Sequence, residues 1–202
     1  MHSPSGDGVA TIVCEDHTAA AWLSDPLTGL VSEDTVVLFR QGRRGGDLPA
    51  GPGRWLPIAG AITEPGDEME ISREFWLQTA DYVSLRYLGV AGPTVVRLAA
   101  SDDAEAYLHD VERTSESGVF PEMLLHPVVE LGDRCALSGG TPCTASGLPS
   151  RLHVDVDGNV RTSPGGRVLG TVGVTAASLA AAALGDGDVC VPAEVAALLA
   201  GG

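Results

Sequence analysis

The sequence predicts an α+β fold, in which a small antiparallel sheet packs with helices and is followed by a C-terminal subdomain with a β-hairpin and two short helices. Three observations predict this fold. The 202-residue chain is 44% hydrophobic and 19% charged, so it has enough apolar side chains to offset the conformational entropy lost on folding. Its 26 glycines and 13 prolines favour short strands joined by turns over a helical bundle. Short apolar runs, some with period-two alternation, lie between these turn residues.

Strands are expected at three apolar runs in the first part of the chain, residues 9–14, 36–39 and 54–59. Pro57 would confine the third strand to an edge or an end of the sheet. Residues 71–88 fit either a helix capped by Ser72 or a pair of strands. The alternation of residues 82–87 favours strands, which would form a hairpin with residues 94–98.

Helices are expected at residues 17–23, 104–113, 176–184 and 192–199. The clearest is 104–113, because Ser101-Asp102-Asp103 provides a cap and apolar residues follow on one helical face. Near the C-terminus, residues 152–156 alternate and Asp157-Gly158 turns them into a second strand, which predicts a hairpin. After Gly118 the sequence continues with an apolar run broken by Pro127 and then a loop of small residues, 132–150. This change predicts a boundary between a first domain, residues 1–117, and a C-terminal subdomain, residues 118–202.

The charge balance argues against nucleic acid as a partner. The formal net charge is −15 and all 12 basic residues are arginine, without a long basic stripe. The first residues lack a basic segment followed by an apolar one, and the longest apolar stretch, 176–184, is too short to cross a bilayer. We therefore expect a cytoplasmic protein without a membrane partner. The four cysteines lack CxxC spacing and are expected to be free thiols.

Metal-ligating and acid/base residues form no complete set in the sequence. His126 and Glu130 are four residues apart, but Pro127 lies between them. Cys135 and the other possible zinc donors, Cys143 and His153, do not have zinc-site spacing. The GxSxG, GxGxxG and phosphate-loop motifs are absent as well. We expect no metal, no cofactor and no catalytic residue, so a binding protein is favoured over an enzyme.

The segment that starts at Asp155 resembles the opening of a calcium loop, because it presents oxygen ligands at alternate positions. The sixth position of such a loop needs glycine and the twelfth an acid, whereas Val160 and Gly166 stand there. A hairpin turn is the better interpretation.

Aromatic residues concentrate in one stretch of the predicted first domain, residues 1–117. Such side chains can line a groove for an extended peptide, while a sheet edge supplies backbone hydrogen bonds. The alternative for each of them is ordinary core packing. The candidate peptide-binding residues are Phe39, Phe75, Trp76, Tyr82, Leu85 and Tyr87.

Residues 102–113 and 151–166 resemble accessory proteins from actinobacterial clusters for ribosomally made, post-translationally modified peptides, closest to the daptide-type recognition proteins. The resemblance implies a winged-helix-like recognition element that captures the precursor's leader as an added strand and presents it to separate modifying enzymes. The length and the glycine-rich segment 42–53 depart from the compact form of that element. Two alternatives stay open. One is an enzyme subunit whose site, with His126, Glu130 or Cys135, is completed by a partner, and the other is a structural subunit of a biosynthetic complex.

Overall fold

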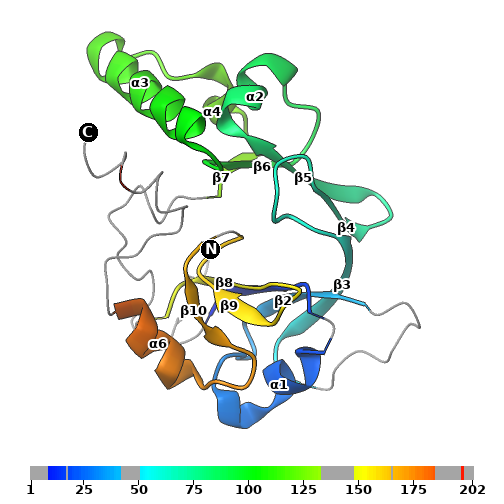
Figure 1. The fold of residues 1–202 in the computed structure, drawn as a ribbon. Coiled ribbons are helices and arrows are strands. Elements are labelled where there is room, and N and C mark those ends of the chain that lie inside the picture. Colours follow the sequence, from blue (N-terminus) through cyan, green and yellow to red (C-terminus); the bar gives the residue numbers. More distant parts are fainter. Residues whose placement is uncertain are drawn as a thin grey trace.

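The computed structural model describes residues 9–16, 18–41, 51–132, 148–164, 166–184 and 197 of the chain. In these residues ten strands form one mixed sheet, which curls into a half-barrel with the order β10-β9-β8-β1-β2-β3-β4-β5-β6-β7 (Figure 1). The predicted α+β fold with a small antiparallel sheet and a winged-helix-like element is therefore wrong. Among the described strands, only β4 and β9 run against the common direction.

The first lobe of the half-barrel holds both ends of the described chain. Its strands are β1 (Thr11–Cys14), β2 (Val36–Arg40), β3 (Arg54–Gly60), β8 (Arg151–Val154), β9 (Asn159–Arg161) and β10 (Val168–Thr171). Its helices are α1 (Ala20–Ser24), the 3₁₀ turn η1 (Pro26–Thr28) and α6 (Ala176–Leu184). The three predicted strands, the Asp157-Gly158 hairpin and the helix at 176–184 are confirmed here. The predicted helix at 17–23 is shorter and shifted, as α1.

The second lobe follows from the carboxyl end of β3. Its strands are β4 (Glu68–Ser72), β5 (Phe75–Asp81), β6 (Thr94–Arg97) and β7 (Val129–Leu131). Its helices are α2 (Tyr82–Leu88), α3 (Ser101–Ser117) and α4 (Glu122–Leu125). The predicted helix at 104–113 is confirmed as the middle of α3. Because β7 pairs with β6 and β8 with β1, both predicted domains contribute to the same sheet, and the boundary at Gly118 stays a prediction.

Residues 82–88 form helix α2, so the predicted strand at 82–87 is wrong. Asp81 caps this helix, since its carboxylate accepts a hydrogen bond from the backbone N–H of Ser84 at 2.6 Å. Tyr82 and Leu85 are three residues apart and both are buried in the same core, which is the spacing of a helical face. Over the same six residues, Val83, Leu85 and Tyr87 also fit a period of two. With α2 as the crossover, β5 and β6 are parallel neighbours and not a hairpin.

Strand β3 joins the two lobes. Its first five residues pair with β2, and Ala59 and Gly60 then pair with β4. Gly60 has a φ of 91° and lies against the backbone of Glu68, a close approach that only glycine allows. Pro57 was expected at an edge, yet β3 lies inside the sheet. Proline is tolerated because, among the described strands, β4 begins to pair only at Ala59.

The helices lie on the outer side of the curled sheet, and each lobe has its own core there (Figure 1). In the first lobe, α1 and α6 pack on outward residues of β1, β2 and β8, such as Ile12, Val37 and Leu152. In the second, α2 and α3 pack on β6 through Val96. The inner face carries a third cluster around Ile58, Ile62 and Met69. Side chains on the alternate positions of the strands therefore face the inside of the half-barrel.

Two further expectations concern the ends of the chain and the membrane. The predicted helix at 192–199 lies outside the described residues, apart from residue 197. Among the helices that are described, none is both long and apolar enough to cross a bilayer.

Candidate functional site

Polar side chains gather inside the half-barrel, where the parallel strands end. Strands β1, β3, β6 and β8 point the same way, so their carboxyl ends meet at one edge of the sheet, where ligands of open α/β sheets usually bind. Glu15 follows β1, Thr63 follows β3, Arg97 ends β6 and His153 lies in β8. We call these four residues the inner polar chain.

The inner polar chain connects the two lobes by direct contacts. His153 Nε2 lies 3.2 Å from Glu15 Oε1. The hydroxyl of Thr63 donates to the two carboxylate oxygens of Glu15 at 3.1 and 3.2 Å, and the backbone N–H of Ile62 donates to Oε1 at 3.4 Å. Arg97 Nη1 donates to the carbonyl oxygen of Thr63. Contacts therefore run from β8 through β1 and the β3–β4 connection to β6.

Burial sets the electrostatics of this chain of contacts. The exposed fractions are 1% for His153, 3% for Arg97 and 4% for Glu15. Burial by itself would raise the pKa of Glu15, but His153 and the hydrogen bonds from Ile62 and Thr63 outweigh it, so the pKa is lowered. The 3.2 Å contact is not a well-directed hydrogen bond, because neither ring nitrogen of His153 has hydrogen-bond geometry to another described residue. A carboxylate–imidazole pair can move protons, but a substrate would reach this one only after the covering residues moved.

The other residues that the sequence suggested as metal ligands or acid/base groups do not form a site in the described part of the chain. His126 is exposed at the end of α4, whereas Glu130 lies in β7 and forms an ion pair with Arg151 of β8. Residues 126–130 are thus not one helical face. Cys135 and Cys143 lie outside the described residues. Within the described part of the chain, no three His, Cys, Asp or Glu residues are grouped as metal ligands.

The hydrogen bonds of Asp155 and the burial of Cys14 indicate structural roles for both residues. The Asp155 carboxylate accepts hydrogen bonds from the backbone N–H groups of Asp157 and Asn159 and from Arg161 Nε. Burial opposes ionisation, but these donors prevail and lower its pKa to about 2, so the carboxylate stabilises the hairpin turn. Burial raises the pKa of the Cys14 thiol to about 12, which makes it a poor nucleophile.

The structure separates the six candidate peptide-binding residues. Phe39 is buried in the first-lobe core, and Tyr82 and Leu85 are buried in the second-lobe core. Phe75 and Trp76 are each 46% exposed on β5, and Tyr87 is 82% exposed on α2. Since adjacent residues of a strand point to opposite faces, not even Phe75 and Trp76 share one side of the sheet. Their role in peptide binding stays a prediction.

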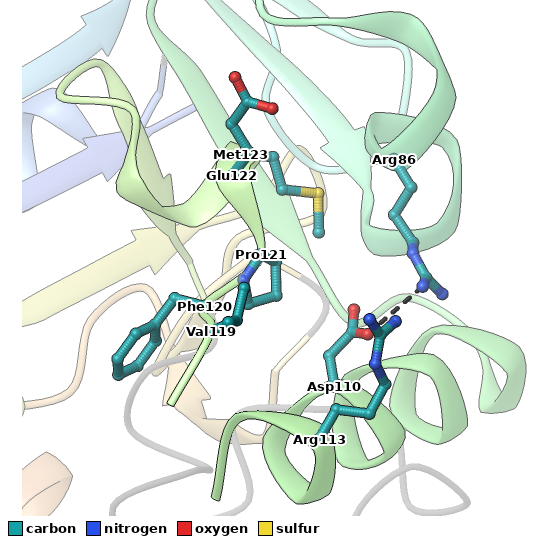
Figure 2. A pocket seen from close by; sticks show the side chains of 8 residues that line it. All are labelled: Arg86, Asp110, Arg113, Val119, Phe120, Pro121, Glu122 and Met123. Atoms are coloured by element: carbon teal, nitrogen blue, oxygen red, sulfur yellow. Dashed lines mark hydrogen bonds and ion pairs between the residues drawn. The ribbon is translucent and has the colours of Figure 1, made fainter. Parts of the chain in front are cut away.

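A surface cleft of about 220 Å³ lies between α2, α3 and α4 in the second lobe. Its lining residues are Arg86, Asp110, Arg113, Val119, Phe120, Pro121, Glu122 and Met123 (Figure 2). Figure 2 shows the two arginines and Asp110 on one side, and Met123, Pro121 and Val119 on the opposite side. The cleft therefore has a charged wall and an apolar wall.

The sequence pointed to His153 only as a possible zinc donor, and the other residues of the inner polar chain and the residues of the cleft were missed. Glu15 had a usable signal, because a charged residue directly after a buried strand marks the carboxyl end of that strand. Arg97 and Arg86 had no such signal, since an isolated arginine in a strand or helix is usually a surface residue. Comparison with protein-family models, curated protein sequences and solved structures finds no match for the chain. The fold and the site define a curled, mostly parallel α/β protein with a buried polar centre.

Proposed function

We propose that the chain is a non-catalytic, cytoplasmic adaptor that binds a ribosomally made precursor peptide and presents it to separate modifying enzymes. The observation that carries the proposal is the distribution of aromatic side chains. The chain has only three Trp, three Tyr and three Phe. Four of these are at least 46% exposed, and all four belong to the second lobe: Phe75, Trp76, Tyr87 and Phe120.

Exposed aromatic surface in one lobe supports a binding role for that lobe. Aromatic side chains are enriched in protein interfaces because they bury a large area at a small loss of conformational freedom. Val119 and Leu125 of the same lobe are also 66% and 65% exposed. In the first lobe, by contrast, Phe39 is buried and Trp22 and Trp55 pack against the core.

The state of the reactive groups also supports an adaptor. Glu15 and His153 are buried and bound to each other, and the Cys14 thiol is buried with a raised pKa. One observation favours a second candidate, an enzyme subunit completed by a partner: the Glu15–His153 pair lies at the carboxyl edge of parallel strands, the usual place for α/β active sites.

The proposal is tested by calorimetry with the precursor peptide encoded beside the gene. We expect a dissociation constant in the micromolar range or tighter, equivalent to about −8 kcal/mol. Trp76→Ala and Phe120→Ala should each weaken binding more than about tenfold, as buried aromatic anchors do. Leu27→Ala is the matched control, because Leu27 is 86% exposed in the first lobe.

Two outcomes would change the proposal. No binding by folded protein at about 100 μM, two decades above the expected dissociation constant, would refute the adaptor role. A His153→Gln variant that folds and binds the peptide normally, yet stops formation of the pathway's product, would establish the enzyme-subunit alternative.

A further inference from the structure

The charged wall of the cleft contains one anchored arginine and one whose guanidinium has no ion-pair or hydrogen-bond partner among the described residues. Asp110 is 6% exposed and accepts a hydrogen bond from the buried Tyr82 hydroxyl at 3.0 Å. Its other oxygen lies 3.3 Å from Arg86 Nη2, so Arg86 is held in place from the core. The guanidinium of Arg113, one turn after Asp110 on α3, makes no ion pair or hydrogen bond with any residue in the described part of the chain. Its planar fork of donors matches a carboxylate.

The local charge differs from that of the whole protein. The chain carries −15 overall and only 12 arginines, yet two of these line one small cleft. Asp110 is already engaged by Arg86 and Tyr82. The carboxylate of Glu122 is directed away from both arginines (Figure 2). The formal charges of the four ionisable lining residues cancel, so the guanidinium of Arg113 is the local positive point that favours an anionic group.

The apolar wall lies opposite this positive point. Met123 and Pro121 lie opposite the arginines, with Val119 beside them (Figure 2). Val119 and Phe120 are 66% and 58% exposed, so the apolar surface continues outside the cleft. A ligand that satisfies both walls within about 220 Å³ needs an anionic group and an apolar group close together, as a carboxylate and an aliphatic side chain on one carbon provide.

We infer that this cleft binds the C-terminal residue of a peptide. The terminal carboxylate contacts Arg113 and Arg86, and the last side chain, an apolar one, packs on Val119, Pro121 and Met123. An internal Asp or Glu offers a carboxylate but only one or two methylene groups for the apolar wall. A terminal leucine or valine presents both groups from a single residue. The inference rests on the proposed peptide-binding function and identifies which part of the peptide the second lobe recognises.

The test uses fluorescence anisotropy of the full chain with three pools of fluorescein-labelled octapeptides, randomised except for a C-terminal leucine. The first pool has a free carboxylate, the second is amidated, and the third is amidated with aspartate fixed before the leucine. The free-acid pool should bind at least about tenfold more tightly than the amidated pool, because a charge-assisted hydrogen bond contributes enough for such a ratio. The third pool should bind like the second.

Arg113→Gln should reduce binding of the free-acid pool to the level of the amidated pool. Arg73→Gln is the matched control, since Arg73 is an exposed arginine in the β4–β5 turn of the same lobe, and it should change binding less than twofold. Both variants should melt like the wild type, because neither side chain forms an ion pair or hydrogen bond with another described residue.

The inference would be overturned by no binding of the free-acid pool at about 100 μM, by equal binding of the acid and amide pools, or by equal effects of the two substitutions. A third pool that matched the free-acid pool would also overturn it, since the cleft would then bind any carboxylate. Precursor binding that depends on Trp76 but not on Arg113 would leave the proposed function intact and refute only the terminal-carboxylate site.

Discussion

Replacing Glu15 by glutamine should destabilise the protein, because it removes the charge from the centre of the inner polar chain. Glu15 is 4% exposed, and its Oε1 lies 3.2 Å from His153 Nε2. Glutamine keeps the shape and an oxygen that can still accept from the N–H of Ile62 and the hydroxyl of Thr63. What is lost is the negative charge beside the imidazole of His153.

The expected loss of unfolding free energy depends on which interactions remain after the substitution. Breaking a buried ion pair by removing one partner costs about 3–5 kcal/mol when the other charge is left behind. Glutamine keeps an oxygen that can accept from the other donors to Glu15, so part of this cost is avoided. We therefore expect a loss of about 2 kcal/mol at pH 7, in the range of a charge-assisted hydrogen bond. For a chain of this size, such a loss lowers the melting temperature by about 4–8 °C.

The effect should depend on pH with a defined sign. Folding lowers the pKa of Glu15 below its ordinary value of 4.5. The contribution of the carboxylate is therefore fully present above the unfolded value and is lost as the pH falls through the folded value. The difference between wild type and Glu15→Gln should be full at pH 7 and should shrink below about pH 4.5.

Urea unfolding followed by circular dichroism at pH 7, 5, 4 and 3 measures this difference. Glu130→Gln is the control. It breaks the ion pair with Arg151, in which the two side chains are 41% and 55% exposed, and a pair so exposed contributes less than about 1 kcal/mol. A Glu15→Gln protein as stable as the wild type at pH 7, or a difference that stays constant down to pH 3, would refute the reasoning.

Two further predictions concern the joint between the lobes and the buried thiol. Gly60 and Gly66 both have φ near +90°, but an added Cβ at Gly60 would overlap the carbonyl oxygen of Glu68, whereas at Gly66 it meets nothing within 4 Å. Gly66→Ala should cost about 1–2 kcal/mol and Gly60→Ala at least about 2 kcal/mol more in urea unfolding, and equal costs would contradict the close approach. Cys14 should resist iodoacetamide at pH 8 in native protein and react once unfolded, because only the thiolate attacks. Peptide mass spectrometry checks this, and rapid native labelling of Cys14 would contradict its burial.

Local signals predicted several elements well. The helix at 104–113 had a capping sequence before it and an apolar stripe on it, and the Asp157-Gly158 turn had alternating residues on both sides. In both cases the interactions that define the element lie within a few residues along the chain. The prediction for residues 82–88 was wrong because, over so short a stretch, Tyr82 and Leu85 fit a helical face while Val83, Leu85 and Tyr87 fit a strand face.

The sheet as a whole could not be predicted from local signals. Parallel pairing depends on which strands a crossover brings together, and the crossover α2 was itself taken for a strand. Strand β8 pairs with β1, which brings together residues about 140 positions apart along the chain. No periodic pattern in the sequence indicates such a long-range contact. The same holds for the inner polar chain, which joins Glu15, Thr63, Arg97 and His153 from four separate segments.

By itself, the sequence determined the excess of negative charge, the short strands, the long helix α3 and the C-terminal hairpin, because each depends on composition or on neighbouring residues. Only the tertiary structure decided the direction of the strands, the curl of the sheet, the burial of Glu15 with His153 and the pairing of a charged wall with an apolar wall in the α2–α4 cleft. The physical reason is that charge and propensity belong to residues and short segments, whereas burial and ion pairing depend on segments that meet only when the chain has folded.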